Sequence, residues 1–118
     1  MSKHNKESGR NGEDLAVEFL LKKGYRILHR NFRFERGEID VVADDGGVLV
    51  FVEVKARRSK QFGEPEEAVS LHKRAQLRKT AKGYLFRYEI DDTECRFDVI
   101  AIEYDRNVTS IRHIENAF

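Results

Sequence analysis

The sequence contains one cysteine, one proline and no long hydrophobic stretch. Because Cys95 has no second cysteine to pair with, an internal disulfide is excluded. The longest apolar run covers residues 48–52, far fewer than a membrane-spanning helix requires. The first residues, MSKHNKESGRNG, also lack the apolar centre of a secretory signal. These absences predict a cytoplasmic protein without a membrane partner.

Strong charge of one sign is also missing, since the formal net charge is only +1. A general attraction of the whole chain to nucleic acid is therefore not expected. Basic residues nevertheless gather in two segments, Lys55, Arg57, Arg58 and Lys60 in one and Lys73, Arg74, Arg78, Lys79 and Lys82 in the other. Such local patches can bind phosphates even on a nearly neutral protein.

The length of 118 residues predicts one domain. We expect residues 1–9 to be a flexible N-terminal segment and residues 10–118 to form that domain. Hydrophobic spacing and turn residues predict helices over 10–23 and 71–88 and strands over 25–34, 38–43, 48–56, 96–103 and 109–115. Ser70 is the expected N-cap of the second helix. The order α-β-β-β-α-β-β indicates an α/β or α+β fold with one sheet flanked by helices.

The strands over 38–43 and 48–56 are predicted to form a hairpin around Asp44-Asp45-Gly46-Gly47. Because side chains alternate between the faces of a strand, Glu38, Asp40 and Val42 share one face of the first strand and Ile39, Val41 and Ala43 the other. On the second strand the valines face the core, whereas Glu53 and Lys55 share the opposite face. We expect Ala43 to pair with Val48, which places Glu38 opposite Glu53 and Asp40 diagonal to Glu53.

Two carboxylates on one face of a sheet repel each other, and partial burial adds a desolvation penalty. A hard divalent cation such as Mg²⁺ or Mn²⁺ removes both problems, because carboxylate oxygens are among its usual ligands. Lys55 would then point at the same phosphate as the cation, which suits phosphodiester hydrolysis. The alternation alone is equally consistent with an exposed strand face whose charges form salt bridges.

Glu13 lies on the same helical face as Val17 and Leu20, at the start of the stripe that faces the core. It is either a further ligand of the same metal, direct or through water, or a favourable charge near a helix N-terminus. The helical pattern alone favours the second interpretation.

Asp40, followed after the hairpin by Glu53-Val54-Lys55, resembles the metal-binding core of the PD-(D/E)XK nuclease superfamily. The stretches GED at 12–14, GEID at 37–40, FVEVKARR at 51–58 and RFDVI at 96–100 resemble the YraN-like bacterial family. That family is similar to archaeal Holliday junction resolvases. The resemblance covers about residues 12–102, and GEID with FVEVKARR at this spacing is more specific than the short acidic motif.

The resemblance implies a restriction-endonuclease-like core with a mixed central sheet. It implies that Asp40, Glu53 and the backbone carbonyl of Val54 bind Mg²⁺ or Mn²⁺. Glu13 matches the first-helix glutamate of the resolvase branch, and this match favours the ligand interpretation. Lys55 would orient or activate water, or stabilise the charge of a phosphorane-like transition state.

The match has one departure, because Gly37-Glu38 stands where the superfamily name has Pro-Asp. Asp40 is the matching acid, and Glu38 is secondary. The implied function is endonucleolytic hydrolysis of DNA, branched or processed DNA included, by a homodimer, with DNA favoured over RNA. The alternative is a non-catalytic nucleic-acid-binding module with the same fold, which would need the basic residues but neither Asp40 nor Glu53. A protein-interaction domain would bind neither metal nor DNA.

Five further residues are expected at the nucleic-acid interface: Arg57, Arg58, Lys60, Lys73 and Gln76. The first three follow the carboxylate site and are expected to contact the phosphate backbone. The two helix residues either reach the site, as helix residues do in the superfamily, or belong to a solvated helix face. Asp98 is expected to pair with an arginine, and the histidines, which show no ligand spacing, are expected at the surface.

Overall fold

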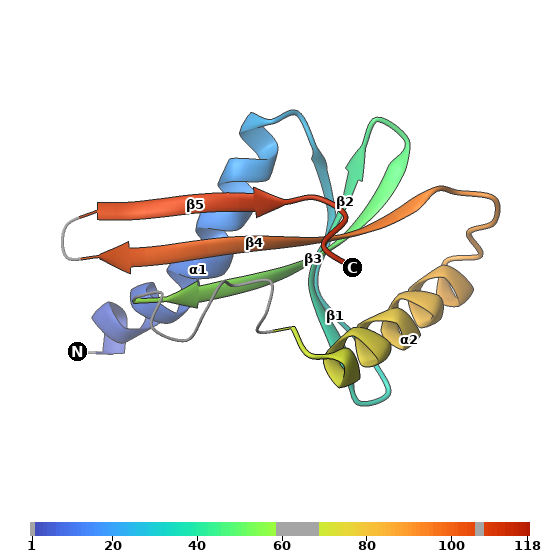
Figure 1. The fold of residues 1–118 in the computed structure, drawn as a ribbon, viewed down its shortest axis with the longest axis horizontal. Helices are drawn as coiled ribbons and strands as arrows, with labels where there is room; N and C mark the ends of the chain where they lie inside the picture. The colour runs from blue at the N-terminus through green and yellow to red at the C-terminus, as the bar shows by residue number, and fades with distance from the viewer. Residues whose placement is uncertain (1, 59–68, 106–107) are drawn as a thin grey trace.

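The computed structural model describes residues 2–58, 69–105 and 108–118, which form one five-stranded sheet with a helix on each face (Figure 1). The elements follow in the order α1 (Ser2–Lys22), β1 (Arg26–Phe34), β2 (Gly37–Asp45), β3 (Val48–Arg57), α2 (Leu71–Arg87), β4 (Cys95–Asp105) and β5 (Val108–Ile114). This order and the α+β architecture confirm the prediction made from the sequence. Within the described residues no helix is long and apolar enough to cross a membrane.

The sheet is mixed, and its strands lie side by side in sequence order. β3 and β4 are parallel, whereas the other neighbouring pairs are antiparallel. Parallel neighbours need a long crossover connection, and α2 lies in the segment that makes it. β3 is therefore a central strand that ends beside the start of the crossover, where Glu53 and Lys55 are located.

Alternating side chains of β3 fill two separate apolar layers. Leu49 and Phe51 pack with Leu77, Ala81 and Tyr84 of α2. Val50 and Val52 pack with Ala16 and Leu20 of α1 on the opposite face. This alternation is the period of two expected of a strand covered on both sides. It fixes Glu53 on the α2 side of the sheet.

The N-cap predicted for α2 is confirmed, whereas α1 starts earlier than predicted. Ser70 caps α2, and its hydroxyl accepts a hydrogen bond from the backbone N–H of Lys73 at 3.1 Å. Gly24 follows α1 with φ +93°, which suits a left-handed helix stop. α1 begins at Ser2 rather than near residue 10, because the backbone stays helical through a polar stretch without apolar periodicity. The flexibility of residues 1–9 remains a prediction.

The hairpin between β2 and β3 is confirmed, but its predicted register was wrong by two residues. Ala43 pairs with Val50 instead of Val48, and Asp45 pairs with Val48. The turn consists of Gly46 and Gly47, both with positive φ, as the common two-residue hairpin turn requires. Glycine adopts this conformation without steric penalty, so the turn centres one residue later than expected.

The predicted faces of β2 were partly wrong. Ile39 packs with Phe32 and Val42 under α2, instead of sharing the α1 face with Val41. Pairing between β2 and β3 ends at Val41 and Val52. The regular alternation of β2 is therefore lost around Asp40, at the point where the two strands stop pairing.

Asp98 and His113 form a buried polar cluster at the opposite side of the sheet. As expected, Asp98 pairs with an arginine, Arg96, at 2.9 Å. His113, expected at the surface, is instead almost completely buried, and its Nε2 lies 2.7 Å from Asp98. The cluster also receives the backbone N–H of Asn116 at 3.1 Å. It ties β4 to β5 and to the C-terminal residues.

Candidate metal and nucleic-acid site

Asp40 and Glu53 meet where β2 separates from β3. Continuing the observed register by one residue from Val41 and Val52 brings these two acids opposite each other, closer than the predicted diagonal. Oδ2 of Asp40 accepts a hydrogen bond from the backbone N–H of Val54 at 2.8 Å. In a continued ladder this N–H would bond to the backbone of β2. The Asp40 side chain therefore takes the place of the next ladder hydrogen bond and is fixed to β3.

The carboxyl groups of Asp40 and Glu53 lie close enough to interact directly, in a largely dry setting. Only 6% of Glu53 is exposed, and Asp40 is half-buried. Burial raises the pKa of Asp40 to about 7, although the hydrogen bond from Val54 partly opposes this rise. The hydrogen bond and negative charge of Glu53, and the charge of Glu13, raise that pKa further. The pair therefore favours a bound proton or another positive charge near neutral pH.

Two lysines supply positive charge to Glu53. Lys55 Nζ lies 3.5 Å from Oε2 of Glu53, and Lys73 Nζ lies 3.6 Å from the same oxygen. Lys55 is two residues further along β3, whereas Lys73 comes from the first turn of α2. Both ammonium groups remain partly exposed. Each lysine side chain thus contacts the buried Glu53 and also reaches solvent.

Glu13 reaches the same region from α1 and is held in place by β1. Its Oε1 accepts hydrogen bonds from Arg30 Nε at 2.8 Å and from Asn31 Nδ2 at 3.1 Å. A Cβ on Gly12 would lie only 3.1 Å from the Cβ of Ala56, so glycine lets α1 approach β3 closely beside Glu13. The sequence analysis did not identify Arg30 and Asn31, because their contact with α1 depends on how the helix crosses β1.

The predicted nucleic-acid residues lie in different surroundings. Arg57 is half-buried and its Nε lies 3.9 Å from Glu103 of β4. Arg58 is exposed directly after β3, and Lys60 lies outside the described residues. Gln76 is half-buried one turn beyond Lys73 on α2. Lys73 is thus the predicted interface residue that the structure brings into contact with the carboxylate site.

The donor set can be compared with the requirements of a divalent cation. In the described part of the chain, no group of three or more His, Cys, Asp or Glu side chains is arranged to hold a metal by itself. Asp40 and Glu53 provide two adjacent carboxylates, and hard cations such as Mg²⁺ commonly bind one or two carboxylates and keep several waters. The donor chemistry of these two carboxylates fits Mg²⁺ or Mn²⁺.

Comparison with known proteins identifies the family. The model of the uncharacterised protein family UPF0102 matches residues 12–102. A UPF0102 protein of Geobacter metallireducens is 48% identical over 118 residues, which cover 100% of this chain and 97% of the relative. A UPF0102 protein of Symbiobacterium thermophilum is 50% identical over 111 residues, covering 93% of this chain and 94% of the relative. These matches agree with the motif resemblance to the YraN-like family, and the chain therefore belongs to the UPF0102 family.

Proposed function

We propose that this protein is a divalent-metal-dependent endonuclease that hydrolyses phosphodiester bonds in DNA. The observation that carries the proposal is the contact between the carboxyl groups of Asp40 and Glu53 in a largely buried site. Two carboxylates this close cannot both ionise without compensating positive charge, of which Lys55 and Lys73 supply a part at Glu53. A cation between them would supply that charge and leave ligand positions for water and a phosphate oxygen.

Asp40, Glu53 and the backbone carbonyl of Val54 would hold the metal, with Glu13 adding a ligand directly or through water. Both known side-chain contacts of Glu13 go to Oε1, so its Oε2 can receive a water. A bound Mg²⁺ or Mn²⁺ would polarise a phosphoryl oxygen and lower the pKa of a bound water. The hydrogen bond from the Val54 N–H fixes the carboxylate of Asp40. The site is therefore held by two strands, which are more rigid than loops.

Lys55 and Lys73 would act on the phosphate. Their ammonium groups flank one oxygen of Glu53 and are accessible from solvent. Positive charge at this position stabilises the negative charge that grows on the phosphate oxygens during hydrolysis. Lys55 is in addition a candidate to orient or activate the attacking water. Arg58, exposed at the end of β3, would contact the backbone of the bound strand.

A cleavage assay tests this proposal. Labelled linear duplex, single-stranded and four-way-junction DNA, and RNA of the same sequence, are incubated with Mg²⁺, Mn²⁺ or EDTA. We expect cleavage of DNA with the metals, none with EDTA, and a loss of at least about 100-fold in Glu53→Gln. Glu115→Gln is the matched control, because Glu115 is half exposed and belongs to the far cluster around Arg96.

The outcomes separate the candidate functions. Cleavage that survives both EDTA and Glu53→Gln would contradict a metal site at Asp40 and Glu53. Salt-dependent binding of DNA without cleavage of any substrate would favour the non-catalytic nucleic-acid-binding module. The choice among substrates would show whether branched DNA is preferred over linear DNA.

A further inference from the structure

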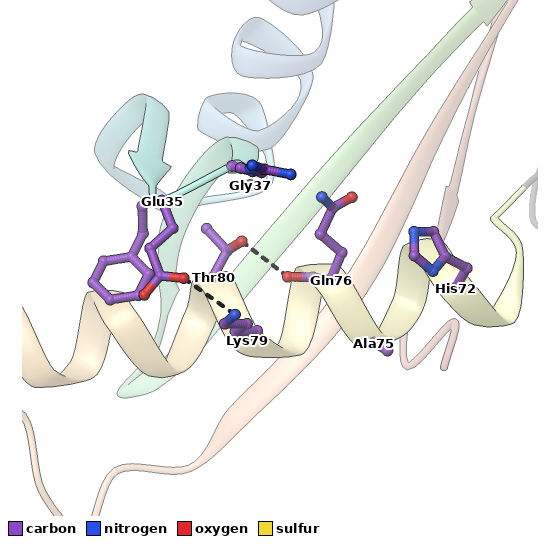
Figure 2. A pocket seen from close by; sticks show the side chains of 9 residues that line it. Glu35, Gly37, His72, Ala75, Gln76, Lys79 and Thr80 are labelled. Atoms are coloured by element: carbon purple, nitrogen blue, oxygen red, sulfur yellow. Dashed lines mark hydrogen bonds and ion pairs between the residues drawn. The ribbon is translucent and has the colours of Figure 1, made fainter.

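A cavity of about 760 Å³ lies beside the carboxylate site, between the β1–β2 turn and α2 (Figure 2). The turn contributes Glu35, Arg36 and Gly37, and α2 contributes His72, Gln76 and Lys79. The sequence analysis predicted Gln76 at a nucleic-acid interface, but it did not predict the cavity, which forms only when the turn packs against the helix. Its lining mixes apolar surface, to which Phe34 and Ala75 contribute, with hydrogen-bond donors and charged side chains.

The cavity is held open by close packing at its base. A Cβ on Gly37 would overlap the hydroxyl of Thr80, so only glycine allows the turn to lie this close to α2. Thr80 is itself fixed, because its hydroxyl donates to the carbonyl of Gln76 at 2.9 Å. Figure 2 shows the side chains of Gln76 and His72 rising from the same side of α2 as Thr80. The lining therefore belongs to packed elements instead of a loose loop.

The cavity and the carboxylate site are neighbours along α2. Lys73, which contacts Glu53, and Gln76, which lines the cavity, are three residues apart and so adjacent on the helix surface. Gly37 and Asp40 both belong to β2, about 10 Å apart along the strand. A strand whose phosphate lies at Glu53 could thus continue directly over Gln76 into the cavity.

The charges of the cavity favour an anion. Among the described residues no acid pairs with Arg36, which is exposed in the turn. Lys79 pairs with Glu35 at 3.1 Å, but both side chains are more than half exposed, and such a surface pair is weak. Lys79 could therefore exchange Glu35 for a phosphate at little energetic cost. His72 and Gln76 add N–H donors.

We propose that this cavity is a second phosphate subsite, which binds the sugar-phosphate backbone of a nucleic-acid strand next to the bond at Asp40 and Glu53. Arg36 and Lys79 are its cationic contacts, and Gln76 and His72 are further hydrogen-bond donors. The inference rests on the proposed function in one respect: that function places the cleaved bond at Asp40 and Glu53, next to the cavity. It adds the β1–β2 turn, on which no residue was predicted to bind nucleic acid.

Binding of fluorescein-labelled DNA and RNA oligonucleotides, measured by anisotropy at several salt concentrations, tests the subsite. The assay uses Ca²⁺ or EDTA so that cleavage does not interfere. We expect the Arg36→Ala, Lys79→Ala double variant to lower the slope of log affinity against log salt by about one for each cation removed. We expect Glu35→Gln to tighten binding by about 2- to 5-fold, because it removes the acid that competes for Lys79. A gain of affinity cannot come from misfolding.

The far end of β1 provides matched controls. Arg26 and Asp44 also form an exposed pair, at 3.3 Å, roughly 25 Å along the strand from the cavity. Arg26→Ala and Asp44→Asn should leave affinity and salt slope unchanged. The subsite is overturned if the double variant behaves like Arg26→Ala, or if Glu35→Gln binds no tighter than Asp44→Asn.

The test separates the subsite from the endonuclease proposal. If the wild type cleaves DNA and the cavity variants bind DNA as tightly as the wild type, the subsite proposal is overturned and the endonuclease proposal stands. A protein that never cleaves, but whose binding responds to the cavity variants as expected, supports the subsite and contradicts the endonuclease. Absence of any nucleic-acid binding by the wild type overturns the subsite. Comparison of the two oligonucleotides shows whether DNA or RNA supplies the phosphate.

Discussion

The carboxylate of Asp40 is bound to the backbone N–H of Val54 at 2.8 Å, at the residue where β2 stops pairing with β3. This hydrogen bond prevents Asp40 from turning away from Glu53, so the repulsion between the two acids cannot be relieved by a change of rotamer. Holding the two carboxyl groups together therefore lowers the free energy of unfolding. Such an arrangement is typical of a site that a ligand completes.

Asp40→Asn should stabilise the protein in the absence of metal at pH 8. The asparagine can still accept the Val54 N–H and can donate its amide to Glu53, while one buried charge disappears. We expect a gain of about 1–4 kcal/mol in the free energy of unfolding, measured by thermal unfolding in EDTA. Lower stability than the wild type at pH 8 would contradict the strained carboxylate pair. The exposed Asp91→Asn serves as control.

The gain from Asp40→Asn should depend on pH. The pKa of Asp40 is raised from 3.8 to about 7 in the folded protein. Between these values the folded state holds a proton that the unfolded chain has lost, so wild-type stability falls as pH rises through this window. The difference between variant and wild type should therefore be small at pH 4 and largest above pH 7. A difference that is constant from pH 4 to pH 8 would show that Asp40 titrates normally.

Asp98→Asn should destabilise the protein strongly. Burial alone would raise the pKa of Asp98, but hydrogen bonds from His113, Arg96 and the backbone of Asn116 outweigh it and hold the pKa below its ordinary value. The stability from this carboxylate is complete above the ordinary pKa of aspartate and is lost as pH falls toward the lowered one. We expect Asp98→Asn to cost about 3–5 kcal/mol at pH 7 and to weaken the acid-induced loss of stability.

Asp45, which pairs with the same arginine as Asp98, provides a control. Asp45 pairs with Arg96 at 3.2 Å, but 40% of its side chain is exposed. Asp45→Asn should cost at most about 1 kcal/mol in chemical denaturation. Equal losses for the two variants would contradict the assignment of Asp98 as the residue that organises the cluster.

Gly83→Ala should loosen the contact between α2 and β1, although alanine is the better helix former. A Cβ at this position would overlap the ring of Phe34, whose side chain packs on the adjacent core. We expect a net loss of about 1–3 kcal/mol in urea unfolding. When Phe34 is already replaced by alanine, Gly83→Ala should cause little further loss of stability, since no ring remains to be displaced. Additive losses would contradict the steric explanation.

Much of this architecture could be predicted from the sequence because the relevant signals are local. The limits of α2 follow from Ser70 and from helical periodicity, and the alternation of β3 follows from its valines. The register of the hairpin could not be fixed, because four turn residues allow more than one loop and only the positive φ of Gly46 and Gly47 selects among them. His113 was missed because its burial depends on Asp98, fifteen residues away on the neighbouring strand.

The candidate site was predictable in part for the same reason. Asp40, Glu53 and Lys55 lie on one hairpin, so alternation brings them near one another. The contact between Lys73 and Glu53 depends on the crossover, and the support of Glu13 by Arg30 depends on how α1 crosses β1. Neither distance has a signature in the local sequence.

Lys55→Ala should reduce cleavage more than Lys73→Ala, with folding unchanged in both. Lys55 is attached to the same strand as Glu53, whereas Lys73 reaches Glu53 from the first turn of α2, across the crossover. We expect losses of about 10²–10³-fold in kcat for Lys55→Ala and about 10-fold for Lys73→Ala. Lys22→Ala, exposed at the end of α1, is the control of equal charge. Cleavage by Lys55→Ala at the wild-type rate would exclude Lys55 from the chemistry.

Binding of Mn²⁺, followed by calorimetry and by electron paramagnetic resonance, tests the central claim most directly, because it requires neither the natural substrate nor turnover. We expect the wild type to bind Mn²⁺ at one site that Mg²⁺ displaces and EDTA empties. Asp40→Asn and Glu53→Gln should each abolish this binding, while Glu115→Gln should retain it. Absence of Mn²⁺ binding by the wild type, or its persistence in both variants, would contradict a metal site formed by Asp40 and Glu53.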